Sequence, residues 1–102
     1  MVTYSDNGLG KLNEHQLGDH WTKVKMTPTE FFAITKSNRF INARRIESIK
    51  AHIIAEQPIF YPSIVYYDQQ LVGYEGTHRT ESIRQLYGDI QMDVLIIQQK
   101  RS

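Results

Sequence analysis

Four segments of the chain carry the apolar pattern of β-strands. Residues 20–26 (HWTKVKM) alternate from one position to the next, which predicts a strand with one solvated face. Residues 61–67 and 71–75 are rich in β-branched and aromatic side chains and are separated by the turn sequence DQQ, so we expect a hairpin. Residues 90–97 have an apolar residue at every second position, and Leu95 and Ile97 on the other face are apolar too, which is typical of a well-buried strand.

A short helix is expected at residues 27–35 (TPTEFFAIT), directly after the first strand. Thr27 is placed to cap this helix, Pro28 occupies its first position, and Glu30 completes a capping box. Three apolar side chains would then fix the helix to the core, namely Phe31, Phe32 and Ile34.

Two longer segments have the period of an amphipathic helix. Residues 42–56 place isoleucines on one face and most charged side chains elsewhere, and Pro58 prevents this helix from continuing. The third helix follows the hairpin, over residues 77–87, and Gly88 is suited to end it.

The order of these elements is strand, helix, helix, hairpin, helix, strand. It predicts a single α+β domain over residues 19–102, with a small mixed sheet and about three helices. Residues 1–18 are polar and contain three glycines, so we expect a flexible N-terminal arm that contributes little to the core. The inward positions of the helices and the last strand should share one core, namely Ile46, Ile49, Ile53, Ile83, Leu86, Val94 and Ile96.

Composition narrows the function classes only slightly. The chain has 102 residues, which favours one domain, and its net charge of +1 does not by itself indicate nucleic-acid binding. Because there is no cysteine, disulfides, thiolate metal sites and cysteine nucleophiles are excluded. No apolar run approaches the roughly 20 residues that span a bilayer, and the N-terminus lacks a signal-peptide layout, so we expect a cytoplasmic protein without membrane contact.

The most informative stretch is EGTHR, where the hairpin gives way to the third helix. A helix N-terminus exposes unpaired N–H groups and a partial positive charge, which together favour an anion. Gly76 would let a phosphate approach the backbone, while His78 and Arg79 add donors. Glu75 could hold a divalent metal ion that bridges phosphates. In the alternative interpretation Thr77 is only a helix cap and its charged neighbours form an ordinary solvated surface.

Other polar residues offer weaker candidates. Arg45, with Arg44 and Arg39, could form a second basic cluster that faces phosphates, or simply a solvated helix face. The four histidines lack metal-ligand spacing, so a zinc site is not expected. Asp93 is a distant second acid. Four tyrosines could stack on a base but are more typical of a half-buried sheet, namely Tyr61, Tyr66, Tyr67 and Tyr74.

The stretch EGTHR, with a strand before it and a helix, a glycine and a terminal strand after it, resembles the ParB/sulfiredoxin-like superfamily. Members of that superfamily show Gly-x-His-Arg or Gly-Glu-Arg-Arg at this corner, often after an acidic residue. The resemblance covers residues 21–97, including the helix NARRIESIKAHI and the strand PSIVYY. It implies a ParB/sulfiredoxin-like fold in which the corner binds nucleotide phosphates.

The resemblance also assigns roles by position. It implies a nucleoside triphosphate and Mg²⁺ as cofactors, with Glu75 binding the metal and Glu75 and His78 as catalytic residues. By position, Gly76, His78 and Arg79 would contact the phosphates. We add two residues to this predicted set on their own chemistry, the Thr77 hydroxyl and Arg45 of the basic cluster. Thr77 stands where the superfamily's sulfinic-acid reductases have their catalytic cysteine, so reduction by that mechanism is excluded.

Three functions follow from this resemblance, in order of preference. The first is a small nucleotide- or phosphate-binding ParB-like domain, with metal-dependent phosphoryl transfer or nucleotide hydrolysis as its chemistry. The second is a non-catalytic regulatory module that binds DNA or a protein partner. The third is a minimal ParB-like nuclease, which would need a second acidic metal ligand. The sequence leaves the oligomeric state open.

Overall fold

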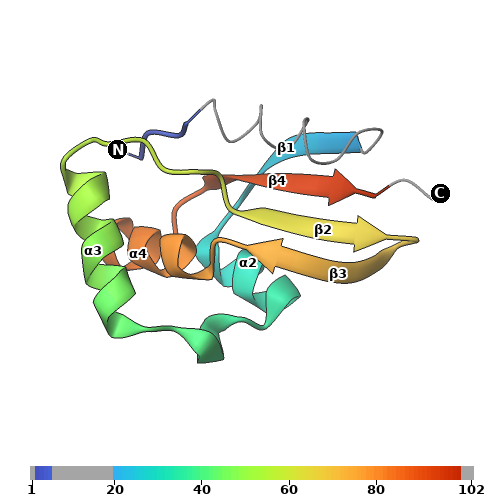
Figure 1. The fold of residues 1–102 in the computed structure, drawn as a ribbon, viewed down its shortest axis with the longest axis horizontal. Coiled ribbons are helices and arrows are strands. Elements are labelled where there is room, and N and C mark those ends of the chain that lie inside the picture. The colour runs from blue at the N-terminus through green and yellow to red at the C-terminus, as the bar shows by residue number, and fades with distance from the viewer. Residues whose placement is uncertain (1, 6–19, 100–102) are drawn as a thin grey trace.

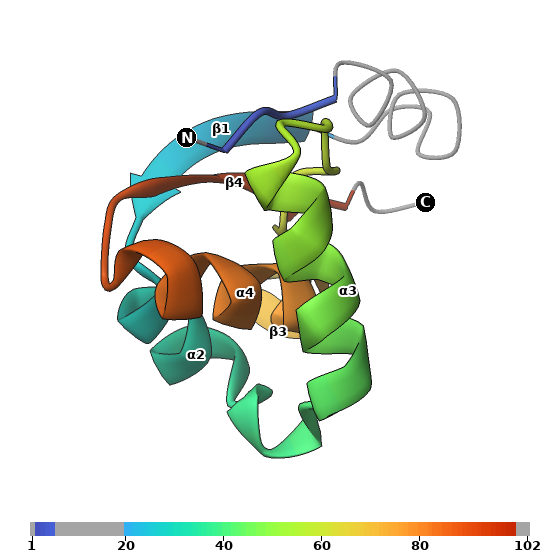
Figure 2. The same cartoon turned by 90° about the vertical axis from the view of Figure 1, so that its left-hand side faces the viewer.

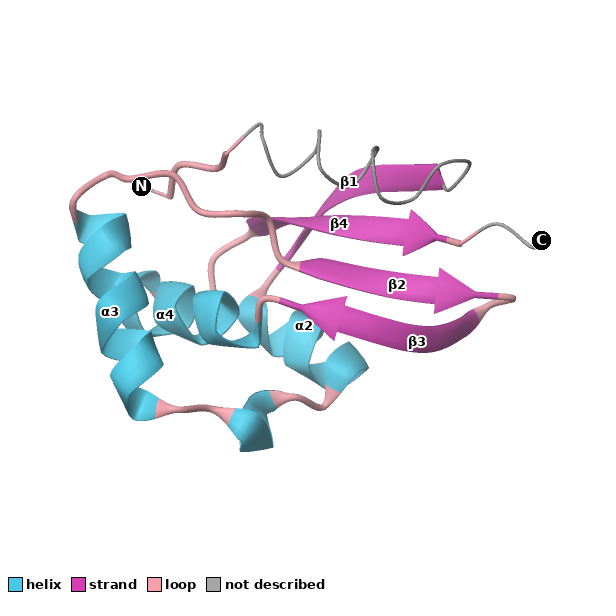
Figure 3. Cartoon of the chain, in the orientation of Figure 1, coloured by secondary structure: helices cyan, strands magenta, loops and turns pink. Residues whose placement is uncertain are grey.

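The computed structural model describes residues 2–5 and 20–99. Within these residues the chain forms the α+β domain that the sequence predicts, with three α-helices and four strands (Figure 1; Figure 3). In chain order the elements are β1 (His20–Met26), α2 (Pro28–Thr35), a 3₁₀-helix (Asn38–Phe40), α3 (Ala43–Ile54), β2 (Ser63–Tyr67), β3 (Gln70–Glu75), α4 (Thr77–Tyr87) and β4 (Met92–Gln98).

The four strands form one mixed sheet in the order β1-β4-β2-β3. β4 pairs antiparallel with β1 and parallel with β2, and β2 and β3 form the expected antiparallel hairpin. The last strand therefore lies in the interior of the sheet. Both faces of this strand are also covered, because Val94 belongs to the main core cluster and Leu95 and Ile97 pack with Tyr61 on the other face. This coverage explains the apolar side chains on both faces.

One face of the sheet packs against the helices. Figure 2 shows α2, α3 and α4 grouped on one side of the strands, and α4 packs against both α2 and α3. The cluster between the helices and the sheet consists of Met26, Phe31, Ile53, Ile59, Ile64, Ile83, Met92 and Val94. The predicted shared core is confirmed, since Ile49, Leu86 and Ile96 pack against this cluster and Ile46 is buried.

Two isoleucines assigned to inward faces are exposed instead. Ile54, at the end of α3, is 66 % exposed, and Ile34 in α2 is 38 % exposed. Successive helical residues are rotated by about 100°. Ile54 therefore points away from the face that buries Ile53, and Ile34, three residues after Phe31, is rotated by about 60° from the face that buries Phe31.

The opposite face of the sheet carries a second, smaller apolar cluster formed by Tyr61, Leu95 and Ile97. Tyr4 packs against it, and its ring stacks on Tyr61 with 4.4 Å between centroids. Two backbone hydrogen bonds of 2.9 Å join residues 2–5 to Ile59. The expectation that the N-terminal arm contributes little to the core is therefore wrong for residues 2–5, and the rest of that arm lies outside the described residues.

None of the helices in the described part of the chain is long and apolar enough to cross a membrane.

Candidate functional site

The corner between β3 and α4 is built on Gly76. This residue precedes the first turn of α4 with a positive φ of 102°, a conformation that side chains disfavour. A Cβ atom at Gly76 would lie 2.7 Å from the Cα of Pro62. A side chain here would thus collide with the backbone before β2. The glycine is needed for the fold, whether or not it also admits a ligand.

The start of α4 carries no side-chain cap. The alternative interpretation, in which Thr77 only caps the helix, is wrong in this respect, because Gly76 is the capping residue and Thr77 is already helical. The backbone carbonyl of Gly76 accepts the first intrahelical hydrogen bond, from the Thr80 N–H at 2.8 Å. The N–H groups of the first turn precede this bond and point out of the helix end.

His78 links the starts of two helices. Its Nε2 accepts a hydrogen bond of 3.0 Å from the backbone N–H of Asn42, the residue that caps α3. Burial lowers the pKa of His78, and the positive charge of Arg45 lowers it further. The imidazole is therefore neutral at pH 7 with its proton on Nδ1, since an accepting Nε2 cannot carry one.

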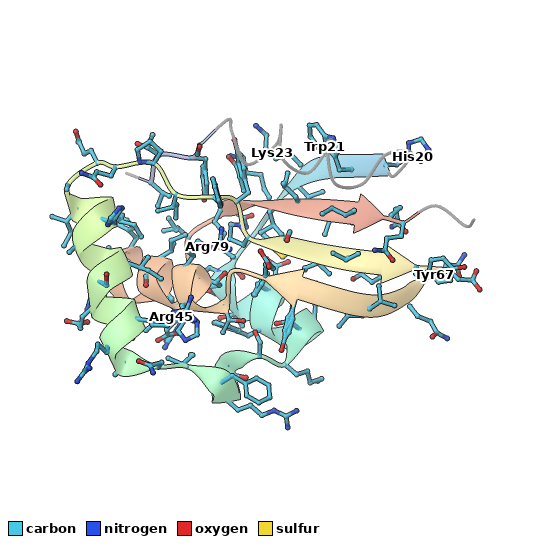
Figure 4. All side chains as sticks on the ribbon, in the orientation of Figure 1. His20, Trp21, Lys23, Arg45, Tyr67 and Arg79 are labelled. Atoms are coloured by element: carbon cyan, nitrogen blue, oxygen red, sulfur yellow. The ribbon has the colours of Figure 1, made fainter. Side chains whose placement is uncertain are left out.

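Arg79 extends from α4 towards the chain that leads into β2 (Figure 4). Its guanidinium donates to the Tyr61 carbonyl at 3.4 Å, and its Nη2 lies 3.9 Å from a Glu75 oxygen. Only 19 % of the side chain is exposed. Burial lowers the Arg79 pKa, Glu75 opposes this effect, and Arg45 adds to it. Arg79 is thus a partly desolvated cation with a second cation nearby.

Arg45 is the one residue of the expected basic cluster that the structure brings to the corner. Its charge acts on both His78 and Arg79, whereas Arg44 is exposed and makes no salt bridge within the described residues. Arg39 lies over the ring of Phe40, with 4.8 Å to the ring centroid. The cluster at the corner therefore consists of two arginines and a neutral histidine.

A cavity of about 230 Å³ lies beside this cluster, between α3 and the chain before β2. Its lining residues are Ser48, Ile49, His52, Ile59 and Arg79. Ser48 and His52 follow Arg45 by three and seven residues, a spacing that places all three on one helix face. The sequence analysis missed Ser48 and His52, and this spacing was the signal that could have found them.

Glu75 ends β3 with its side chain 82 % exposed. Within residues 2–5 and 20–99, no group of three or more His, Asp or Glu side chains is arranged so that it could hold a metal ion. Mg²⁺ is usually bound by one or two carboxylates together with the phosphates of its nucleotide. An exposed Glu75 beside a bound phosphate fits that arrangement, with the ligand supplying the other oxygens.

The remaining candidates lie elsewhere. Asp93 forms a 2.7 Å ion pair with Lys25 of the edge strand, so it supplies no second acid at the corner. Tyr61 is buried and Tyr66 packs against the core, as the sheet interpretation predicts. Among the other histidines, His20 begins β1, and His15 lies outside the described residues.

In comparisons with known proteins, no family model, no curated protein and no solved structure matches the chain.

Proposed function

We propose that the chain is a ParB/sulfiredoxin-like domain that binds the phosphates of a nucleoside triphosphate, with Mg²⁺, at the start of α4. The observation that carries this proposal is the meeting of Arg45, His78 and Arg79 at an uncapped helix N-terminus. Each of these features favours an anion, and phosphate oxygens can accept from all of them at once.

The electrostatics of the corner support a bound anion. Two guanidinium groups and the positive end of α4 repel one another, and Arg79 has already lost much of its hydration. The nearest carboxylate, on Glu75, is 3.9 Å from Arg79 and largely in water, where its attraction is screened. A phosphate between the arginines and the helix would offset this repulsion.

His78 would act as a neutral hydrogen-bond donor. Because Asn42 occupies Nε2, Nδ1–H is the donor that remains for a phosphate oxygen. The cavity along α3 would take the nucleoside, with Ser48 and His52 as polar contacts and Ile49 and Ile59 as apolar ones. In this placement the ligand would lie along the face of α3 that carries Arg45, Ser48 and His52.

The chemistry that suits such a site is phosphoryl transfer, including nucleotide hydrolysis. In these reactions the protein mainly positions the phosphates and neutralises charge. Glu75 would hold the metal ion that the phosphates also bind. When bound, this ion would stabilise the negative charge that develops on the transferred group.

The runner-up is a non-catalytic regulatory module that binds DNA or a protein partner. The observation that favours it is the single exposed acid at the corner, Glu75, which leaves few groups to activate a nucleophile. The nuclease proposal ranks third because Asp93, the other acid considered, is paired with Lys25.

Calorimetry with a panel of nucleoside triphosphates, with and without Mg²⁺, tests the proposal. We expect at least one nucleotide to bind, and Arg79→Ala to weaken binding by roughly 1.5–3 kcal/mol, the range for hydrogen bonds to charged groups. Because Arg79 also supports the Tyr61 carbonyl, Arg79→Lys provides a milder second variant.

Arg44→Ala is the matched control, since Arg44 is exposed in the same turn as Arg45. Binding by a folded Arg79→Ala as tight as that of the parent would refute the site, as would a parent that binds no nucleotide. Phosphate release then separates the two leading functions. Turnover that Glu75→Gln abolishes supports the enzyme, and binding without turnover supports the module.

A further inference from the structure

A second cavity, of about 410 Å³, lies between α2, the 3₁₀-helix and α4. Its lining residues are Thr29, Phe32, Asn38, Ile41, Glu81 and Arg84. None of them belongs to the corner or to the cavity along α3. The proposed nucleotide site therefore gives no account of this charged and partly apolar cavity.

A buried carboxylate is part of its lining. The Glu81 side chain is only 6 % exposed, and its oxygens accept from Arg84 Nε at 2.7 Å, Arg84 Nη2 at 2.5 Å and Gln85 Nε2 at 2.8 Å. Burial tends to raise the pKa of Glu81, but the bonds from Arg84 and Gln85 outweigh it and hold the pKa below its usual value. Glu81 is therefore an ionised group whose acceptor positions are largely occupied.

Glu81 fixes the orientation of Arg84. A guanidinium has five N–H donors in one plane, and Glu81 binds one on Nε and one on Nη2. The opposite edge, formed by Nη1 and Nη2, remains a pair of parallel donors. The Arg84 side chain is 49 % exposed and lines the cavity.

This pair differs from an ordinary ion pair on a helix surface. In α3, Glu47 pairs with Lys50 at the same i,i+3 spacing, but the Glu47 side chain is 70 % exposed. Burying an ionised carboxylate such as Glu81 carries a large desolvation cost, and apolar side chains of similar volume are often as stable in its place. The buried position of Glu81 is therefore better explained by its role in orienting Arg84 than by a contribution to the stability of the fold.

We propose that this cavity binds a small carboxylate, with the carboxylate oxygens on the free edge of Arg84 and a short apolar part against Phe32 and Ile41. The paired oxygens of a carboxylate match a guanidinium edge, and the Asn38 amide can donate as well. Because Glu81 already holds the guanidinium in place, binding would require little further ordering of the side chain.

The charges around the cavity favour a monoanion over a phosphate. Glu81 balances the charge of Arg84, and Asp89 lies close enough to act on Arg84 as well. Asp89 itself accepts a hydrogen bond of 2.9 Å from the Thr29 N–H at the start of α2. A dianionic phosphate would meet repulsion from both acids, whereas a singly charged ligand with an apolar part meets less.

A titration followed by ¹H–¹⁵N NMR tests this inference on the parent protein without any substitution. The probes are isovalerate and its neutral analogue isovaleramide, compared at constant ionic strength. We expect isovalerate to cause saturable shifts at Thr29, Asn38, Ile41 and the Arg84 Nε–H. Isovaleramide should bind about tenfold or more weakly, because it cannot form the charged pair of hydrogen bonds.

Arg84→Lys keeps the charge but loses the planar edge, so it should weaken isovalerate binding several-fold. Arg44→Lys, on exposed α3 surface, should leave it unchanged. The absence of saturable shifts in the parent, equal binding of isovaleramide, or a folded Arg84→Lys that binds as the parent does would each overturn the inference. These outcomes are independent of the nucleotide test, which involves Arg79 and a different cavity.

Discussion

At the scale of single residues, His78 has two roles that few side chains can fill together. It accepts a hydrogen bond from the Asn42 N–H, and it stands in the first turn of α4, where a donor would suit a phosphate. A neutral imidazole offers an acceptor at one nitrogen and a donor at the other, whereas a protonated one offers no acceptor. The contact with Asn42 therefore depends on the protonation state of His78.

This dependence predicts how stability changes with pH. Burial and Arg45 lower the pKa of His78 in the folded state, so the unfolded chain takes up this proton at a higher pH than the folded one does. The contribution of His78 is then fully present above its ordinary pKa of 6.5 and is lost as the pH falls through the folded value. Urea denaturation from about pH 8 to about pH 5 measures this loss.

His78→Gln is the comparison for this experiment. Its side-chain oxygen can accept from the Asn42 N–H but does not titrate, so the variant should lose less stability on acidification than the parent. The difference between the two proteins isolates His78 from the other titrating groups. Identical pH dependence in both would show that the folded-state pKa of His78 is not depressed.

At the scale of elements, the sequence predicted a helix or strand correctly where the residues that determine it are close together in the chain. The capping box of α2 is present with both hydrogen bonds, at 3.0 and 3.1 Å between Thr27 and Glu30. Its two residues are three positions apart, so the sequence alone places them together. The strand pattern of residues 90–97 likewise predicted a buried strand, which β4 is.

The candidate site was less predictable, because its contacts join distant positions. The residues of EGTHR are contiguous, and their convergence at a helix start could be expected. The partner of His78 is a backbone N–H at Asn42, 36 positions away, and that of Arg79 is a carbonyl at Tyr61, 18 positions away. Which backbone group a side chain meets depends on how the elements pack, and periodicity does not specify this.

The junction of β3 and α4 gives a prediction about Gly76. In Gly76→Ala, the left-handed backbone should cost about 1–2 kcal/mol, and displacement of Pro62 should add to this. Gly73→Ala is the matched control, because its Cβ would make only ordinary contacts of 3.8 Å or more with Val65. Urea denaturation should show a clear loss for Gly76→Ala and little or none for Gly73→Ala. Equal effects would mean that the corner relaxes without strain.

At the scale of the whole molecule, the central strand β4 is covered on both faces by different parts of the chain. The helices cover one face, and Tyr61 and Tyr4 pack over Leu95 and Ile97 on the other. The apolar pattern of β4 predicted that both faces would be buried but not what would cover the second. Tyr4 stands in a polar, glycine-containing segment, which is why the sequence analysis assigned it to an arm.

If residues 2–5 are part of the folded body, removing the Tyr4 ring should destabilise the whole domain. Tyr4 is half-buried and its ring stacks on Tyr61, and burial raises the pKa of its hydroxyl to about 12. An aromatic pair contributes roughly 0.5–1.5 kcal/mol beyond its area. With the lost burial, we expect Tyr4→Ala to lower the free energy of unfolding by about 1–3 kcal/mol.

Tyr67→Ala makes the same truncation at the end of the β2–β3 hairpin, where the ring is 39 % exposed, so its effect should be smaller. Tyr4→Phe keeps the stacked ring and loses only the hydroxyl contact of 3.4 Å with the Asp93 N–H, so it should lie close to the parent. Urea denaturation of all three variants ranks them. If Tyr4→Ala unfolds at the same urea concentration as the parent, residues 2–5 do not contribute to the stability of the domain. The packing on the second face of β4 would then not require them.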